Sequence, residues 1–169
     1  MDIYDNNINV LTNYIADGSK GCNSNAVGVE LEHFVIDKNG DCVPYINGVE
    51  NIIEQLAQNF SKHVYSEGFL IGLSCDKYNI TLEPGAQIEI SIKPTENICE
   101  IENIYGEFLS VINPILDKYS YRLTTLGYMP KNKAKDISLI PKKRYEYMNK
   151  YFKSVGTRGI NMMRGTASA

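Results

Sequence analysis

The chain lacks any close pair of cysteines. It has four, Cys22, Cys42, Cys75 and Cys99, and no two of them form a C-x-x-C pair. This scatter argues against a zinc knuckle and fits free thiols in a reducing compartment better than a disulfide framework. The first ten residues, MDIYDNNINV, are acidic and polar, which argues against a secretory signal or a transit peptide. We therefore expect a cytoplasmic protein.

The sequence also lacks an excess of positive charge and any long apolar run. Its formal net charge is -3 and its isoelectric point is near 5.4, which argues against partners recognised by charge, such as nucleic acid or an anionic membrane. Its apolar runs are too short to span a bilayer. With 169 residues, 43% of them hydrophobic, the chain is long enough to form one core. We expect a single domain over residues 1–169, with neither nucleic acid nor membrane as a partner.

No β-α-β winding pattern and no glycine-rich phosphate loop are present. Helical periodicity predicts amphipathic helices over residues 1–20, 49–63 and 95–119, and Pro141 opens a short basic helix that runs to Phe152. Strand patterns cover residues 27–37, 42–46, 69–73, 78–82, 86–92, 121–128 and 159 onward. The order predicts an α+β fold in which helices cover a mostly antiparallel, curved sheet.

The stretch VGVELEHFVID places Glu30 and Glu32 two residues apart in a predicted strand, so both carboxylates point to the same face. They would lie about 6.5–7 Å apart. At an effective dielectric constant of 20 they would repel by roughly 2–3 kcal/mol. Solvent would screen most of that repulsion, and a divalent cation would reverse its sign. Taken alone, the pair is more typical of a solvated polar face.

A second acidic stretch, ITLEPGAQIEIS, strengthens the case for a site. Gln87, Glu89 and Ser91 alternate with apolar residues and share one face of the predicted strand. Glu83 precedes Pro84-Gly85, a pair suited to a type II turn. A two-residue hairpin would place Glu83 on the apolar side, but type II turns splay such hairpins. We therefore predict a bulge or a wider connection that returns Glu83 to the polar face.

The candidate metal ligands are then the four carboxylates of Glu30, Glu32, Glu83 and Glu89. All donors are oxygens, without cysteine or histidine at metal-binding spacing, so the expected ion is Mg²⁺ or Mn²⁺. Mg²⁺ retains waters and shares its coordination shell with substrate phosphates, so an acidic sheet face suggests nucleotide phosphates held through the metal.

Three motifs together resemble a known family. They are E-x-E-x-F at Glu30, Glu32 and Phe34, L-E-P-G-x-Q-x-E-x-S from Leu82 to Ser91, and the stretch from Gly127 through the run MMRGT that ends at Thr166. Their order and spacing resemble the N-terminal portion of glutamate–cysteine ligase of the plant and proteobacterial type. The resemblance implies a glutamine synthetase-like fold, ATP and Mg²⁺ as cofactors, and glutamate and cysteine as substrates. The implied reaction forms γ-glutamyl phosphate, from which the cysteine amine displaces phosphate.

Carried over by position, the resemblance implies that the four glutamates bind metal and that Gln87 lies among them at the cofactor. It also implies that Arg164 and Thr166 lie on a strand lining the amino-acid pocket, where an arginine could bind a substrate carboxylate in bidentate fashion and take part in catalysis. Lys143 and Arg144 are candidates for anion binding, and a solvated helix start explains them equally well. Members of the family commonly have a second glycine where this chain has Ala86.

Two alternatives remain open from the sequence. One is a carboxylate–amine ligase of the same fold that uses an amine other than cysteine. The other is a non-catalytic, truncated chain that acts as a binding or interaction module, because the pattern stops in mid-strand at MMRGTASA. We expect little ligase turnover from the 169 residues alone, and we expect that an unpaired sheet edge permits self-association.

Overall fold

The computed structural model describes residues 2–19, 25–156 and 158–169, so Cys22 and Thr157 lie outside the described residues. The strands of the described part are β1 (Val27–Ile36), β2 (Lys62–Ser66), β3 (Phe69–Ser74), β4 (Tyr78–Leu82), β5 (Ile88–Thr95) and β6 (Arg122–Thr124). The α-helices are α1 (Ile3–Asp17), α2 (Glu50–Leu56), α3 (Ile98–Lys118), α4 (Lys143–Val155) and α5 (Gly159–Gly165). Shorter helical turns are η1 (Tyr45–Val49), η2 (Ala57–Asn59) and η3 (Ala134–Asp136).

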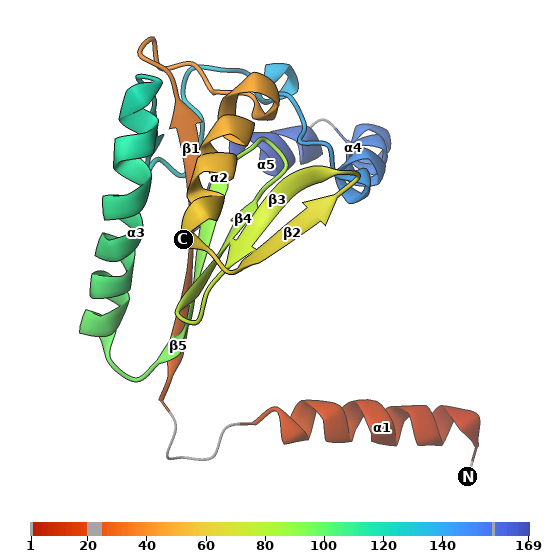
Figure 1. The fold of residues 1–169 in the computed structure, drawn as a ribbon. Coiled ribbons are helices and arrows are strands. Elements are labelled where there is room, and N and C mark those ends of the chain that lie inside the picture. The colour runs from red at the N-terminus through yellow and green to blue at the C-terminus, as the bar shows by residue number, and fades with distance from the viewer. Residues whose placement is uncertain (1, 20–24, 157) are drawn as a thin grey trace.

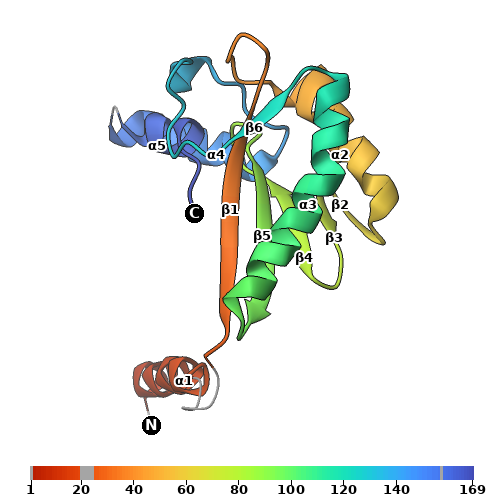
Figure 2. The ribbon, with the colours of Figure 1, turned by 90° about the vertical axis from the view of Figure 1, so that its left-hand side faces the viewer.

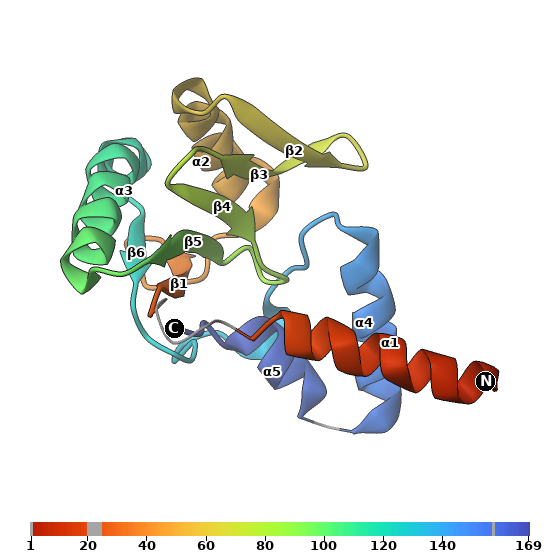
Figure 3. The same ribbon diagram turned by 90° about the horizontal axis from the view of Figure 1, so that it is seen from below.

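The strands form one sheet in the order β2-β3-β4-β5-β1-β6, and every paired neighbour is antiparallel (Figures 1 and 3). Helices α2 and α3 pack on one side of the sheet, while α4 and α5 lie on the other (Figure 3). The predicted α+β class with a helix-covered antiparallel sheet is confirmed.

The main core lies between the sheet and the α2–α3 layer (Figure 2). Ile88, Ile90 and Ile92 of β5 are buried, whereas Glu89 and Ser91 between them are only partly buried. This is the alternation expected of a strand with one packed face and one polar face. The facing stripe of α3 consists of Ile101, Ile104, Phe108, Ile112, Ile115 and Leu116. Full burial of each such side chain stabilises the fold by about 1.5–3 kcal/mol.

A second, smaller core surrounds Phe34 near the end of β1, where Phe34 packs with Met129, Ile137 and Ala167. Phe34 shares its face with Glu30 and Glu32 because the three are two residues apart in sequence. The same face is therefore apolar and covered at one end of β1, and polar at the other. This packing brings the last residues of the chain beside the glutamates of β1.

Four predicted segments differ in the structure; of the strand predicted over residues 121–128, only Arg122–Thr124 forms β6. Residues from Gly159 form helix α5 and not a strand, because Met163, Arg164 and Gly165 are buried by packing against α4 and η3. Tertiary packing overrides a glycine-flanked sequence that favours extended backbone. Residues 42–46 make only an isolated bridge, between Ile36 and Cys42, before η1 begins.

The fourth difference is the predicted helix 49–63, which ends early. Helix α2 stops at Leu56, and residues 62–66 form the edge strand β2. Four of the five β2 residues are exposed, so no apolar alternation marks this strand in the sequence. Within the described ranges, no helix has the length and apolar character needed to cross a membrane.

Candidate functional site

The pairing of β1 with β5 aligns the polar residues of the two acidic stretches. Glu32 lies directly opposite Glu89, and Glu30 lies directly opposite Ser91. On the other side of β5, Thr81 lies opposite Glu89. Directly opposite residues of antiparallel strands share a face, with Cβ atoms roughly 4.5–5.5 Å apart. We call the polar face that carries Glu30, Glu32, Glu83 and Glu89 the acidic face.

Glu83 reaches the acidic face through the turn between β4 and β5. Its N–H donates to the Gln87 carbonyl at 2.9 Å, and the Ala86 N–H donates to the Glu83 carbonyl at 2.9 Å. Glu83 therefore pairs with Gln87 across a three-residue connection, and the predicted wider connection is confirmed. The expected type II turn is wrong, because Ala86 and not Gly85 has positive φ, at 65°. A three-residue hairpin loop requires that conformation at its last residue.

Gln87 holds this turn in place and is almost fully buried. Its Oε1 accepts a hydrogen bond from the Gly85 N–H at 2.7 Å, and its Nε2 donates to the Thr166 carbonyl at 2.7 Å. Both ends of the side-chain amide are thus bonded to main chain. Gln87 ties the β4–β5 turn to the segment after α5, which is a positioning role.

The acidic face carries unbalanced negative charge. Burial, and then the carboxylates of Glu89 and Glu32, raise the pKa of Glu83, while Lys142 and a hydrogen bond from Tyr145 act in the opposite direction. A like charge nearby always disfavours the ionised form of an acid. Burial is the larger cause, and the charges of Glu89 and Glu32 add to it.

Cations border the acidic face at the start of α4. The buried Tyr145 hydroxyl donates to Glu83 Oε1 at 3.3 Å and accepts from Arg144 Nη2 at 3.3 Å. Lys142 Nζ lies 4.8 Å from the centre of the Tyr145 ring, and Arg144 Cζ lies 5.0 Å from it. Burial, and then Arg144, lower the pKa of Lys142, whereas Glu83 and Glu89 raise it. Two cations and one carboxylate therefore meet at a single tyrosine.

Sequence reasoning singled out Lys143 and Arg144 but missed Lys142 and Tyr145. Lys143 is exposed, whereas Lys142 is partly buried, and the charges of Glu83 and Glu89 raise the pKa of Lys142. The signal available in the sequence was the unbroken run of cations after Pro141, which includes Lys142. Which member of such a run faces the sheet depends on where α4 begins.

Arg164 is buried and hydrogen-bonded away from the acidic face. Its Nη1 donates to the Ile137 carbonyl at 2.8 Å and its Nη2 donates to Asn149 Oδ1 at 2.6 Å. Thr166 donates its hydroxyl to the Met162 carbonyl at 2.6 Å. The structure therefore brings the four glutamates together on one face, and places Arg164 in the packing between η3, α4 and α5.

The end of the chain contributes Ser168, which sequence reasoning did not select. The Ser168 hydroxyl and N–H donate to the Glu32 carboxylate at 2.8 and 2.9 Å. On the neighbouring strands, Thr81 and Ser91 donate their hydroxyls to Glu89 Oε1 at 2.8 and 2.7 Å. These hydroxyls hold the two opposed carboxylates in fixed positions.

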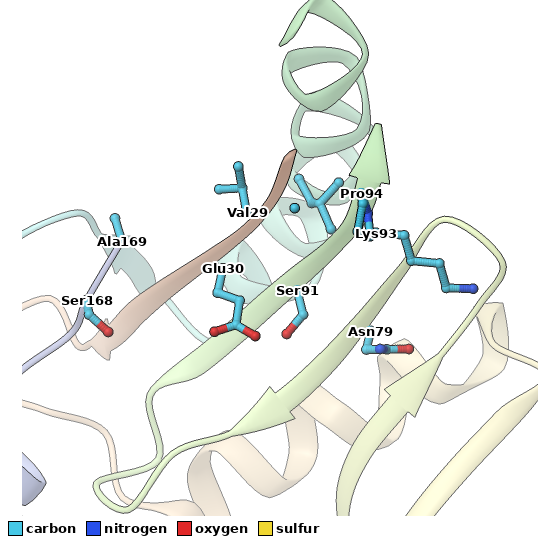
Figure 4. Close-up of a pocket in the computed structure, with 10 residues that line it drawn as sticks. Val29, Glu30, Asn79, Ser91, Lys93, Pro94, Ser168 and Ala169 are labelled. Carbon is cyan, nitrogen blue, oxygen red and sulfur yellow. The ribbon is translucent and has the colours of Figure 1, made fainter. Parts of the chain in front are cut away.

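Beside these carboxylates lies an open hollow of about 590 Å³. Glu30, Ser91 and Asn79 project from β1, β5 and β4 to the same side, and Ser168 lies along β1 (Figure 4). Lys93 lies further along β5 and also lines the hollow. The hollow is wide enough for a small ligand.

The carboxylate oxygens of the acidic face are the type of ligand that a hard cation such as Mg²⁺ prefers. Within the described residues, no three His, Cys, Asp or Glu side chains are grouped closely enough to hold a metal ion as they stand. Mg²⁺ keeps several waters and needs only one or two protein carboxylates, so two adjacent glutamates satisfy its requirement. Carboxylates on a sheet and cations at a helix start form a site suited to a metal and to phosphate groups.

Comparison with known proteins identifies the family of this chain. Residues 26–169 match the family described as glutamate-cysteine ligase family 2, and the chain belongs to that family. It is 30% identical over 159 residues to the chloroplastic glutamate–cysteine ligase of Medicago truncatula, covering 94% of this chain and 31% of that protein. It is 30% identical over 156 residues to the chloroplastic enzyme of Arabidopsis thaliana, covering 92% of this chain and 30% of that protein. The chain thus spans about a third of the length of these relatives.

The cytoplasmic location expected from the sequence is wrong by this comparison. The relatives from Medicago truncatula, Arabidopsis thaliana and Brassica juncea are all chloroplastic proteins. Scattered thiols indicate a reducing environment, and they do not distinguish one reducing compartment from another.

Proposed function

We propose that this chain supplies the metal- and phosphate-binding face of an ATP-dependent ligase that joins glutamate, through its γ-carboxylate, to the amine of cysteine. Membership of the family and the names of the relatives support the reaction. The observation that carries the residue assignment is the contact at Tyr145, where Glu83 of the acidic face meets Lys142 and Arg144. Such a border is complementary to a phosphate chain that carries bound metal.

In this proposal Glu30, Glu32, Glu83 and Glu89 hold Mg²⁺ or Mn²⁺. The bound metal would neutralise the charge of the ATP phosphates. The protein would fix the position of the metal charge, because hydroxyl groups already orient the carboxylates of Glu32 and Glu89. Phosphoryl transfer depends mainly on positioning and charge stabilisation, so a rigid carboxylate array serves it without any covalent step by the protein.

Lys142, Lys143 and Arg144 would bind phosphate oxygens at the start of α4. The first N–H groups of a helix are unpaired, and the helix dipole favours an anion there. Arg144 and Lys142 lie on the Tyr145 ring, which fixes their positions. The glutamate γ-carboxylate would then attack the γ-phosphate of ATP to give γ-glutamyl phosphate and ADP, and the cysteine amine would displace phosphate.

For Arg164 the contacts support a positioning role in this reaction. Its two bonds fix Ile137 and Asn149 relative to α5. A direct bidentate contact with a substrate carboxylate would require those bonds to break. Gln87 and Thr166 act similarly, because they connect the turn beside Glu83 to the segment that leads to Ser168.

A calorimetric titration with MgCl₂ or MnCl₂ tests the metal assignment. The wild-type chain is compared with Glu30→Gln/Glu89→Gln and with Glu54→Gln/Glu102→Gln, which removes the same charge from α2 and α3. We expect the first variant to lose the binding heat and the control to keep it. Equal heats from all three proteins would refute the assignment.

Turnover tests the reaction itself. Because the chain spans about a third of its relatives' length, we expect little ADP release from the 169 residues with glutamate, ATP and cysteine. Rapid γ-glutamylcysteine formation by this chain would show that the acidic face suffices. ADP release that is faster with another amine than with cysteine would favour a ligase of different amine specificity.

A further inference from the structure

Helix α1 presents a large apolar surface to solvent. It lies beyond the start of β1, away from the sheet and from the other helices (Figures 1 and 2). No residue of α1 is buried. Its apolar face consists of large side chains at helical spacing that are 45–79% exposed: Tyr4, Ile8, Leu11, Tyr14 and Ile15. A contiguous exposed apolar patch of this kind is typical of an interaction site.

An isolated helix with the sequence of α1 is only marginally stable in water. Helices of up to about 12–15 residues gain most of their stability from packing of an apolar face, and α1 has 15 residues. All of them except Leu11 and Ala16 are Ile, Val, Tyr, Thr, Asn or Asp, which are weak helix formers. Helix α1 therefore needs a partner surface to be stable.

The charge of α1 narrows the choice of partner. Its charged side chains are Asp5 and Asp17, with Asp2 at the N-cap, and it has no Lys or Arg. Helices that lie on anionic membranes carry Lys and Arg on their polar face, so α1 is not suited to such a surface. The complementary surface has an apolar centre with positive charge at its border.

Helix α4 of the same chain has such a surface. Tyr147, Tyr151 and Val155 are spaced four residues apart and are 60%, 61% and 57% exposed. They form one stripe on the solvent side of the helix, which we call the α4 stripe. Lys150 and Lys153 are exposed on the same helix, which carries four cations and one carboxylate in all. The α4 stripe therefore complements the apolar face of α1 in polarity and in charge.

Within one chain, α1 and α4 adjoin opposite ends of β5. Val27, where the chain enters β1 after α1, pairs with Thr95 at the end of β5. Tyr145 of α4 contacts Glu83 in the turn that precedes β5. A second copy related by two-fold symmetry can place its α1 on this α4 and receive the first copy's α1 on its own α4. Such an exchange forms two equivalent helix contacts in each dimer.

We infer that α1 of one copy packs on the α4 stripe of a second copy, so that two copies exchange their first helices. The apolar face of α1 would cover the stripe, and Asp5 and Asp17 would lie near Lys150 and Lys153. This association differs from pairing through an unpaired sheet edge, because it involves no strand. It is also independent of the proposed ligase chemistry, because no carboxylate of the acidic face takes part.

Sedimentation velocity of the 169-residue chain from about 10 to about 500 µM tests this inference. We expect a reversible dimer with a Kd below about 100 µM. Leu11→Ala/Ile15→Ala removes apolar contacts from α1 without lowering its helix propensity, and Tyr147→Ala/Tyr151→Ala removes them from the α4 stripe. We expect each variant to weaken dimerisation by about tenfold or more. A wild-type chain that stays monomeric over this range would overturn the inference.

The matched control is Val64→Ala/Tyr65→Ala, because both residues are exposed apolar side chains on the edge strand β2. We expect it to change the Kd by less than about twofold. A control that weakens dimerisation as much as the other two variants would assign the association to the sheet edge and overturn the inference.

A mixture of the two helix variants tests the exchange between copies. Each variant alone lacks both helix contacts. A dimer of one variant with the other keeps one intact contact, between an unchanged α1 and an unchanged α4 stripe. We therefore expect the mixture to associate more strongly than either variant alone. A mixture that associates no more strongly than the separate variants would contradict the exchange.

Discussion

Glu32 of β1 and Glu89 of β5 lie directly opposite each other, so two carboxylates leave the sheet side by side. Like charges in this position destabilise a sheet by roughly 0.2–1 kcal/mol. Serine and threonine hydroxyls hold both carboxylates in place. A bound cation would convert the repulsion between them into attraction.

The first prediction concerns that pair. Replacing Glu32 with Gln removes the repulsion, so we expect the metal-free chain to gain up to about 1 kcal/mol in free energy of unfolding. With saturating MnCl₂ we expect the variant to be less stable than the wild-type chain, because the variant has lost a metal ligand. Urea unfolding with and without metal measures both effects. Glu30→Gln is the control without metal, since Glu30 faces Ser91 and not a carboxylate. An identical response of the two variants would contradict the account.

The second prediction concerns pH. The pKa of Glu83 is raised above its ordinary value of 4.5, first by burial and then by Glu89 and Glu32. Between 4.5 and the raised value, the folded chain binds more protons at Glu83 than the unfolded chain does. This group therefore makes the fold more stable as the pH falls through that window. Glu83→Gln should remove this contribution from a series of thermal unfolding curves. If the stability of the variant depends on pH in the same way as that of the wild type, Glu83 makes no such contribution.

The third prediction concerns His33, which is buried between the sheet and α3. Burial lowers the pKa of His33 from its ordinary value of 6.5, and its Nε2 lies 2.8 Å from the Tyr105 hydroxyl. Its protonation is then unfavourable in the folded chain, so this group lowers stability as the pH falls below 6.5. An NMR titration of the ring protons measures the pKa directly. His63→Gln assigns the signal, because the chain has only two histidines. A midpoint at or above 6.5 would disprove the expectation.

The fourth prediction concerns Gly85 in the turn beside Glu83. A Cβ added there would lie 2.9 Å from the Arg164 carbonyl oxygen and 2.9 Å from Ile137 Cγ2. We expect Gly85→Ala to lower the free energy of unfolding by about 1–3 kcal/mol. Gly106→Ala is the control, since that glycine is exposed within α3 and has nothing near its Cβ position. It should raise stability by about 0.4–1 kcal/mol. Equal effects of the two changes would refute the close approach at Gly85.

Much of the acidic face could be predicted from the sequence, because strand alternation alone determines which side chains share a face. Alternation placed Glu30 with Glu32, and Gln87 with Glu89. The register of the two strands was not predictable, yet any register that keeps both apolar faces in the core also keeps the glutamates on one face. The turn at Glu83 was predictable in width because a two-residue hairpin would have buried a carboxylate.

The parts of the structure that could not be predicted from the sequence depend on tertiary contacts. Helix α5 forms because Gly159 and Gly165 allow close packing, with Phe152 near the first and Tyr128 near the second. No local pattern reports such contacts, so a strand was predicted there. Arg164 therefore lies in a helix and not on the predicted strand. Lys142 was missed for a similar reason, because its orientation depends on the start of α4 and on Tyr145.

The most direct test of the central claim is a titration of ATP into the chain with and without MgCl₂. The account predicts that ATP binds in the presence of Mg²⁺, that binding is lost when Mg²⁺ is omitted, and that it is also lost in Glu32→Gln/Glu89→Gln. ATP affinity that is the same with and without Mg²⁺, and unchanged in that variant, would contradict it.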